Sequence, residues 1–338
     1  ALVSAAEAMD DSGIDLEQID KTRAGVIWAS GIGGVDALMT ELRGFIGGNG
    51  TPRFSPFFIP KIIIDIAAGF ISIKYGFMGP NYSTVSACAS SSNAVINATN
   101  LIRLGLADVI ISGGSEAAVN EIGIGGFNAL MAISTKNDDY ETASRPFCTT
   151  RDGFVLGEGG AALILEEYEH AVKRGANIYA EVVGVGLTAD AHHITAPHPE
   201  GIGAALVMQN AIKNANISPE KIDYINVHGT ATPLGDVAEL IAIQKVFGEH
   251  AYNLNISSSK SMTGHLLGAA GSLEALFTIK AMENSLVPPT INLQELDQSI
   301  DPKLNLTLHK AQERKINYGL SNTFGFGGHN TSIIFKKI

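Results

Sequence analysis

The chain has 338 residues, of which 45% are hydrophobic, and carries a formal net charge of −11. This length suits one or two structural halves with a sizeable core, and the negative charge argues against nucleic acid or an anionic membrane surface as a partner. No apolar run reaches the roughly 18 residues that a membrane-spanning helix needs, and no leader pattern opens the chain, so we predict a cytoplasmic protein.

Strands and helices alternate along the chain, which favours α/β layers over a β-sandwich or a helical bundle. An amphipathic helical pattern opens the chain at Ala1–Met9, and helical periodicity returns at Ser90–Leu104 and from Leu234 onwards. The predicted strands, in chain order, are Ala24–Ala29, Tyr82–Val85, Val109–Ser112, Gly160–Glu166, Tyr179–Leu187, Ile225–Val227, Leu254–Ser257 and Ser332–Phe335.

Two parts of the chain repeat the same order of elements. The strand at Ala24–Ala29 leads into a glycine turn and a helix, and the strand ending at Val227 does the same. We therefore predict a duplicated α/β unit, with one half over residues 1–170 and the second over residues 171–338.

Cys88 is the best nucleophile candidate in the chain, because it lies between a β-forming run and a helical pattern. The start of a helix carries unpaired N–H groups and a partial positive charge, which favour the thiolate and can hold an oxyanion. The alternative is a buried structural cysteine. Cys148 is the only other cysteine, so a disulfide framework is not expected and the role of Cys148 stays open.

Three further segments carry polar residues in glycine-rich turns: Val227–Pro233 with His228, Ser259–His265 with Lys260 and His265, and Asn322–His329. The first two follow strand-like runs, and strand-to-helix turns are where α/β folds place their chemistry. One cysteine with two histidines on such turns indicates nucleophilic acyl transfer, followed by stabilisation of an enolate or oxyanion.

Four motifs in this order resemble those of the β-ketoacyl-[acyl-carrier-protein] synthases. They are Ser-Ala-Cys-Ala-Ser-Ser, His-Gly-Thr-Ala-Thr-Pro-Leu-Gly-Asp, Lys-Ser-Met-Thr-Gly-His-Leu-Leu-Gly-Ala-Ala-Gly and Phe-Gly-Phe-Gly-Gly. The resemblance spans the chain and is greatest to synthase II. It implies an α/β, thiolase-like fold, in which two duplicated halves form a layered αβαβα arrangement. Relative to that family the sequence begins inside a helix, so the first half is expected to lack its opening strand.

The same resemblance implies a set of site residues. Cys88, His228, His265 and Lys260 would be catalytic, and the backbone N–H groups of Cys88 and Phe326 would form the oxyanion hole. Glu274 would be a buried carboxylate near Lys260, with a solvated helix position as the alternative. The residues that would line the acyl or pantetheine site are Phe127, Ile32, Thr230, Thr232 and Phe326. Core packing for Phe127, and turn chemistry for the two threonines, are about as plausible.

The implied reaction condenses an acyl group on Cys88 with malonyl-[acyl-carrier protein], giving a 3-oxoacyl product and CO2 in fatty acid elongation. Acyl carrier protein and a second copy of the chain would be the partners. A polyketide or aryl-polyene ketosynthase is the nearer alternative. A non-catalytic chain-length subunit is a further one, although such a subunit would usually lack the nucleophile. Acyl chain length, pathway and the identity of the carrier stay open.

No metal or cofactor is predicted. His192, His193 and His198 lie close in sequence, but no cysteine or second carboxylate falls at a ligand spacing beside them. The glycine-rich turns do not match either nucleotide-binding pattern, and the implied condensation needs no cofactor.

Overall fold

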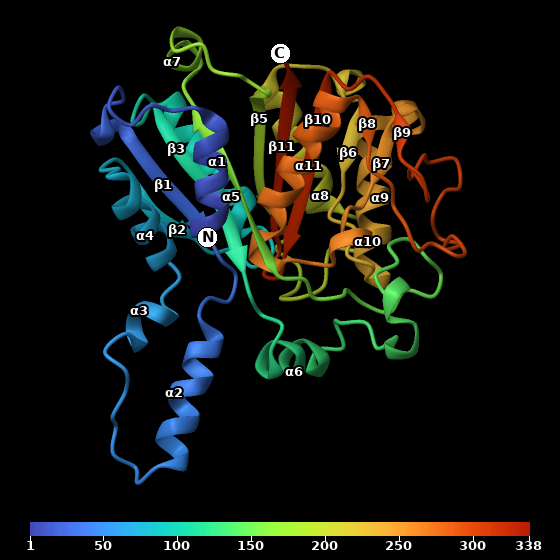
Figure 1. Ribbon diagram of the computed structural model, residues 1–338. Helices are drawn as coiled ribbons and strands as arrows, with labels where there is room; N and C mark the ends of the chain where they lie inside the picture. Colours follow the sequence, from blue (N-terminus) through green and yellow to red (C-terminus); the bar gives the residue numbers. More distant parts are fainter.

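The computed structural model describes residues 1–338 and contains two mixed β-sheets with helices around and between them (Figure 1). The strands are β1 (Ala24–Ala29), β2 (Asn81–Thr84), β3 (Val109–Glu116), β4 (Gly159–Glu166), β5 (Ala180–Ala189), β6 (Tyr224–Asn226), β7 (Asn255–Ser257), β8 (Leu286–Val287), β9 (Gln312–Glu313), β10 (Tyr318–Gly325) and β11 (His329–Lys337).

The helices follow in the same numbering. They are α1 (Leu2–Ser12), α2 (Val35–Gly47), α3 (Phe58–Ile62), α4 (Ile66–Tyr75), α5 (Ser90–Arg103), α6 (Glu121–Ala129), α7 (Tyr168–Lys173), α8 (Ile202–Ala215), α9 (Pro233–Phe247), α10 (Lys260–Thr263) and α11 (Ala270–Asn284). Short 3-10 turns lie at Lys21–Arg23, Asn137–Thr142, Pro219–Lys221, Gly248–Asn253 and Leu267–Ala269.

The two sheets repeat one strand arrangement. The first has the order β2-β1-β3-β4, with β1 parallel to β2 and β3, and β4 antiparallel to β3. The second has the order β7-β6-β10-β11-β5, with β6 parallel to β7 and β10, and β11 antiparallel to β10 and β5. The strand β5 is the one member of the second sheet without a counterpart in the first.

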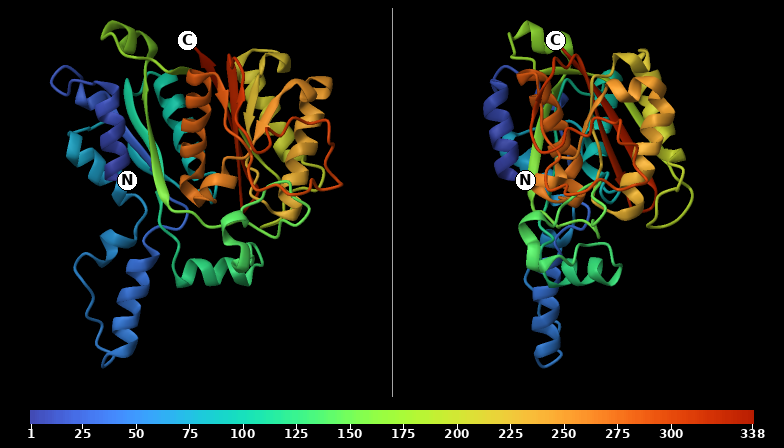
Figure 2. Two further views of the ribbon diagram at one scale, coloured as in Figure 1. Left: turned by 45° about the vertical axis from the view of Figure 1, so that its right-hand side comes forward. Right: turned by 90° about the vertical axis from the view of Figure 1, so that its right-hand side faces the viewer.

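The central helices α5 and α11 pack between the two sheets, while α1 and α4 cover the outer face of the first sheet and α8 and α9 that of the second (Figure 2). Three apolar clusters fill the interfaces between these layers, and the middle cluster joins Ile27, Ala94, Ala275 and Phe335. The predicted layered αβαβα arrangement is confirmed.

The central helices approach closely because small residues face each other across the two halves. A Cβ atom placed on Gly271 of α11 would lie 2.0 Å from Oγ of Ser92 on α5. In addition, the N–H of Ser272 donates to Oγ of Ser91 at 2.9 Å. This polar contact fixes the register of one half against the other.

The strand β4 pairs with β3 along one edge, and no strand pairs with its other edge. A groove of about 700 Å³ follows this open edge. Apolar side chains such as Leu163, Leu273 and Ile279 line it, and α1, β5 and α11 border it. Neither Cys88 nor either candidate histidine borders this groove, so it is separate from the predicted site.

Every predicted strand overlaps an observed one, but the strand β10 was not predicted. Residues Asn322 to Gly325 belong to that strand, and the turn that the glycine pattern indicated is confined to Phe326–Gly328. The helices α2 and α3 extend away from the layered body in both views (Figures 1 and 2). None of the helices is long and apolar enough to cross a membrane.

Candidate active site

Cys88 lies in a strained turn between β2 and α5. The preceding residue, Ala87, has a φ of 50°, in the left-handed region that non-glycine residues rarely adopt. Ser90 holds this turn, because its hydroxyl donates to the carbonyl of Ala87 at 2.6 Å and accepts from the N–H of Ser86 at 2.9 Å. The half-buried Cys88 thiol is therefore presented at the start of α5.

His228 lies just beyond β6, where a buried carboxylate holds the backbone. The N–H groups of His228 and Gly229 each donate to a different oxygen of Glu239, both at 2.9 Å. Glu239 projects from α9, and burial raises the pKa of its carboxyl to about 7 in spite of these hydrogen bonds. The sequence analysis missed Glu239. Its signal was a second acidic residue three positions after Asp236, in a stretch of the sequence that is otherwise apolar up to Ile243.

His265 follows the short helix α10 and is buried between two other rings. The rings of Phe154 and His228 stand nearly perpendicular to it, with centroids 5.2 and 5.3 Å away. The N–H of His265 donates to the carbonyl of Val155 at 2.7 Å. Both imidazole nitrogens have no hydrogen-bond partner, so they are free for a thiol or a substrate.

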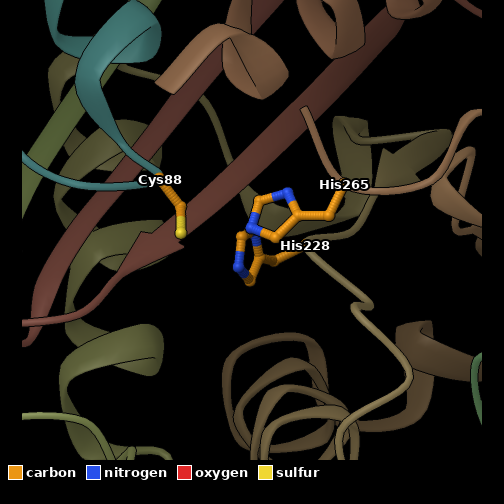
Figure 3. Close-up of side chains that lie close together, drawn as sticks. All are labelled: Cys88, His228 and His265. Carbon is orange, nitrogen blue, oxygen red and sulfur yellow. The ribbon is translucent and has the colours of Figure 1, made fainter. Parts of the chain in front are cut away.

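The three side chains meet although they come from separate turns in both halves of the chain (Figure 3). The Cys88 Sγ and one nitrogen of each imidazole all lie within 4.8 Å of one another. These are also the residues that could hold a metal ion, since thiolate and imidazole are both zinc ligands. The structure thus brings together Cys88, His228 and His265 as the sequence analysis expected.

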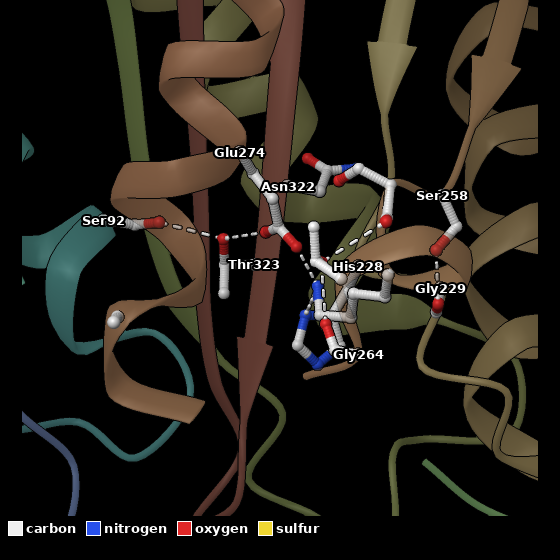
Figure 4. Close-up of polar contacts among 12 residues, drawn as sticks. Ser92, His228, Gly229, Ser258, Gly264, Glu274, Asn322 and Thr323 are labelled. Carbon is white, nitrogen blue, oxygen red and sulfur yellow. Dashed lines mark hydrogen bonds and ion pairs between the residues drawn. The ribbon is translucent and has the colours of Figure 1, made fainter. Parts of the chain in front are cut away.

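Lys260 and Glu274 form a buried ion pair beside His228. The chain of polar contacts continues from Glu274 to the Thr323 hydroxyl at 3.5 Å, and from Thr323 to Ser92 at 2.9 Å (Figure 4). Glu274 is therefore buried and paired, not solvated. Leaving either charge unpaired in this interior would be costly, so the pair must be kept or replaced together.

Lys260 also fixes the tautomer of His228. Its Nζ lies 3.5 Å from Nδ1 of His228, and an ammonium group can only donate. Nδ1 of His228 is therefore the acceptor, and the imidazole proton is on Nε2. This leaves His228 as a hydrogen-bond donor on the side away from Lys260.

Burial and positive charge keep both imidazoles neutral. The pKa of His228 is held well below its ordinary value by burial, then by Lys260 and His265. The pKa of His265 is held well below its ordinary value by burial, then by Lys260. Neutral imidazoles accept a proton at one nitrogen and donate from the other, which suits proton transfer near pH 7.

The protonation state of Cys88 differs from the one that the sequence analysis predicted. Burial raises the pKa of Cys88 to about 11, although Lys260 and the backbone N–H groups of Phe326 and Cys88 lower it. The expectation of a thiolate was therefore wrong, because desolvation of the charge outweighs the favourable start of α5. The thiol needs a base, and the unpartnered His265 is placed to act as one. The backbone N–H groups of Phe326 and Cys88 both face the sulfur, and each lowers the pKa of the thiol.

A pocket of about 370 Å³ opens at Cys88, His228 and His265. Of the residues predicted to line the acyl or pantetheine site, it is bordered by Phe127, Thr230, Thr232 and Phe326. Phe127 packs edge-on against Phe154, with ring centroids 5.3 Å apart. Ile32 does not border the pocket, and its side chain is exposed, because the turn after β1 directs it outward.

Cys148 is a buried free thiol outside this pocket. Burial raises its pKa, but hydrogen bonds from the N–H of Glu295 and from Thr150 outweigh burial and lower the pKa to about 7. Its Sγ lies 3.3 Å from Oγ1 of Thr150. Cys148 and Cys88 are both free, and nothing in the structure explains why cysteine occupies position 148.

The depressed histidine pKa values predict how the imidazoles titrate. In the folded protein, the ring signals of His228 and His265 should stay in their neutral form from pH 8 to pH 6, whereas unfolded histidine titrates near about 6.5. The stability that depends on the neutral rings is complete above the unfolded pKa and is lost as the pH falls toward the folded values.

Carbon-13 NMR of labelled histidine checks this, with the urea-unfolded chain as the reference. His228→Gln and His265→Gln each remove one signal and so assign the pair. A midpoint at or above about 6.5 for either ring would contradict the neutral assignment.

Sequence comparison identifies relatives over the whole chain. Residues 1–171 match the family described as beta-ketoacyl synthase, N-terminal domain, and residues 179–294 match its C-terminal domain. The 3-oxoacyl-[acyl-carrier-protein] synthase 2 of Coxiella burnetii is 47% identical, over 100% of this chain and 81% of its own length. The enzyme of the same name from Staphylococcus aureus is 48% identical, over 100% of this chain and 80% of its own.

A solved structure also matches the whole chain. It contains a type II PKS acyl-carrier protein in complex with its ketosynthase bound to the hexaketide, and its TM-score to this chain is 0.95 at 34% identity. The match covers 100% of this chain and 83% of that one. With its two duplicated α/β halves, and with a cysteine and two histidines meeting between them, the chain belongs to the β-ketoacyl synthase family.

Proposed function

We propose that the chain condenses an acyl group held on Cys88 with malonyl-[acyl-carrier protein], releasing CO2 and a 3-oxoacyl product. The observation that carries this proposal is the meeting of one thiol and two neutral imidazoles within 4.8 Å, in a pocket that opens at all three residues. Such a set supports both acyl transfer to sulfur and stabilisation of an enolate.

The first step transfers the acyl group to Cys88. A nitrogen of His265 takes the thiol proton, and the sulfur attacks the acyl thioester carbonyl. The N–H groups of Cys88 and Phe326 hold the oxyanion, and losing one such donor typically costs on the order of a hundredfold or more in rate. The carrier thiolate then leaves and recovers the proton from His265. The acyl chain occupies the pocket beside Phe127.

The second step makes the new carbon–carbon bond. Nε2–H of His228 and the imidazole N–H of His265 donate to the thioester carbonyl of the malonyl group. The bond to the carboxylate breaks, CO2 leaves, and its electron pair forms an enolate held by these two donors. The enolate carbon attacks the acyl carbonyl carbon, the bond from that carbon to the sulfur breaks, and Cys88 leaves as a thiolate. This thiolate takes up a proton that solvent supplies through His265. Neutral rings suit this step, because they stabilise the enolate without protonating it fully.

The names of the relatives favour the fatty acid pathway, since both high-identity enzymes are called 3-oxoacyl-[acyl-carrier-protein] synthase 2. A polyketide role is the second candidate, because the matched ketosynthase was solved with a type II PKS carrier protein. Its lower identity, 34% against 47%, places it second. A non-catalytic chain-length subunit is disfavoured by the presence of Cys88, His228, Lys260 and His265 together. We place the reaction in the cytoplasm.

We also propose that the protein works as a homodimer. The outer edge of β2 pairs with no strand, and exposed apolar side chains surround it on α3, α4 and the loops beside them. These side chains are Phe57, Ile59, Ile63, Phe70, Ile73, Met78 and Val85. Several exposed apolar side chains beside an open strand edge, together called the apolar patch below, are typical of an interface, and a second copy covers them by adding its own β2.

The condensation is tested by mixing the protein with acyl-loaded and malonyl-loaded carrier and following both CO2 and the mass of the protein. The unaltered chain should gain the mass of one acyl group and release CO2. Cys88→Ala should do neither. His228→Ala should still be acylated but should condense about 10² to 10⁴ times more slowly, because it loses an enolate donor.

Cys148→Ala is the matched control, since it removes the other free thiol and should keep both activities. An acyl adduct that persists in Cys88→Ala, or unimpaired condensation by His228→Ala, would contradict the proposed roles.

The dimer is tested by light scattering after size exclusion. The unaltered chain should elute at twice its 35.5 kDa, whereas Ile73→Asp should shift it toward the monomer by placing a charge in the apolar patch. Leu104→Asp changes a similarly exposed residue outside the patch and should leave the mass unchanged. A monomeric unaltered chain would rule the interface out.

A further inference from the structure

Glu116 is a buried acidic residue to which the reaction above assigns no role. It is the last residue of β3 and is only 4% exposed. Its carboxyl group accepts four hydrogen bonds and faces no lysine or arginine within ion-pair distance. Each of the two carboxyl oxygens accepts two of these bonds.

The four donors come from both halves of the molecule. Three belong to the turn after β1: Ser30 Oγ at 2.7 Å, the N–H of Gly31 at 2.6 Å and the N–H of Ile32 at 3.2 Å. The fourth is the N–H of Gly268, at 3.0 Å, which lies three residues beyond His265. One carboxylate therefore joins the first half to the segment that carries a catalytic histidine.

The backbone around Glu116 has no spare room. A Cβ atom on Gly268 would lie 2.1 Å from the nitrogen of Gly31 and 2.7 Å from Oε2 of Glu116. A Cβ atom on Gly31 would lie 2.9 Å from the same oxygen and 3.4 Å from the carbonyl oxygen of Ala87. Glycine at both positions lets the two turns meet around the carboxylate, directly beside the residue that precedes Cys88.

We propose that Glu116 is a positioning residue, which holds the His265 segment in alignment with the Cys88 turn for the condensing step. This inference rests on the proposed function. His265 and Cys88 come from different halves, so their alignment depends on contacts that cross between the halves. The Glu116 carboxylate joins the His265 segment, through Gly268, to the turn after β1, and Gly31 of that turn lies beside the carbonyl of Ala87, the residue that precedes Cys88.

The charge of Glu116 gives this role a second, independent signature. Burial is the main reason why the pKa of Cys88 is raised, and the negative charge of Glu116 raises it further. Glu116→Gln removes the charge but keeps the shape of the side chain, so it should lower the pKa of Cys88. Glu116→Asp keeps the charge but shortens the side chain, so it should disturb the hydrogen bonds. The two effects can therefore be separated by two substitutions.

The experiment compares Glu116→Gln and Glu116→Asp with the unaltered protein. Each protein is first acylated on Cys88, and the single-turnover rate of condensation with malonyl-loaded carrier is measured per acylated site. Both variants should condense about tenfold more slowly or worse, because misplacing a catalytic group by a fraction of an ångström is costly. The KM for malonyl carrier should stay unchanged, because Thr230 and Thr232, which are predicted to bind the pantetheine arm of the carrier, lie on a turn that Glu116 does not contact.

Alkylation of Cys88 by iodoacetamide across pH supplies the second readout. The midpoint should fall in Glu116→Gln and should not fall in Glu116→Asp. Glu158→Gln, in which an exposed carboxylate that accepts one backbone N–H is replaced, is the matched control and should behave like the unaltered protein.

A condensation rate per acylated site that stays within about twofold of the unaltered protein in both variants would overturn the positioning role. If Glu116→Gln does not fold, Glu116→Asp alone decides the positioning role. An unaltered protein that is acylated but forms no 3-oxoacyl product would contradict the proposed function itself, and the inference would fall with it.

Discussion

The active site depends on how closely the two halves of the chain dock. Cys88 belongs to the first half and both histidines to the second, so no single α/β unit contains the site. Glycine and serine make the close approach possible, since a Cβ atom on Gly271 would lie 2.0 Å from Ser92 Oγ. Polar contacts then fix the register, as between Ser272 and Ser91. Small residues at this interface are thus a requirement of the chemistry as well as of packing.

Burial sets the protonation states on which the reaction relies. The same desolvation that keeps His228 and His265 neutral also keeps Cys88 protonated. Because the two imidazoles and the Cys88 thiol are all neutral in the resting state, none of them pays the free-energy cost of burying an isolated charge. The one fixed cation in the site, Lys260, is balanced by Glu274. Charge on the three reacting side chains therefore appears only when substrate arrives, and the oxyanion and enolate donors are already in place to receive it.

Local sequence predicted the parts of the site that local structure creates. The turns with Cys88, His228 and His265 follow strands that were predicted from hydrophobic pattern, and Glu274 was expected to be buried because apolar residues surround it in α11. The strand β10 was missed because Ser321, Asn322 and Thr323 are polar but buried, so no apolar alternation marks them. The thiol state of Cys88, the outward direction of Ile32 and the contacts of Glu116 all arise from tertiary packing, which periodicity does not encode.

The most direct test of this account is a crystal structure of the protein acylated at Cys88 by its carrier. The account predicts that the acyl carbonyl oxygen lies about 3 Å from the backbone nitrogens of Cys88 and Phe326. It also predicts that the acyl chain extends beside Phe127 and that the rings of His228 and His265 face the open side of the thioester. An acyl group attached elsewhere, or a carbonyl oxygen turned away from both nitrogens, would contradict it.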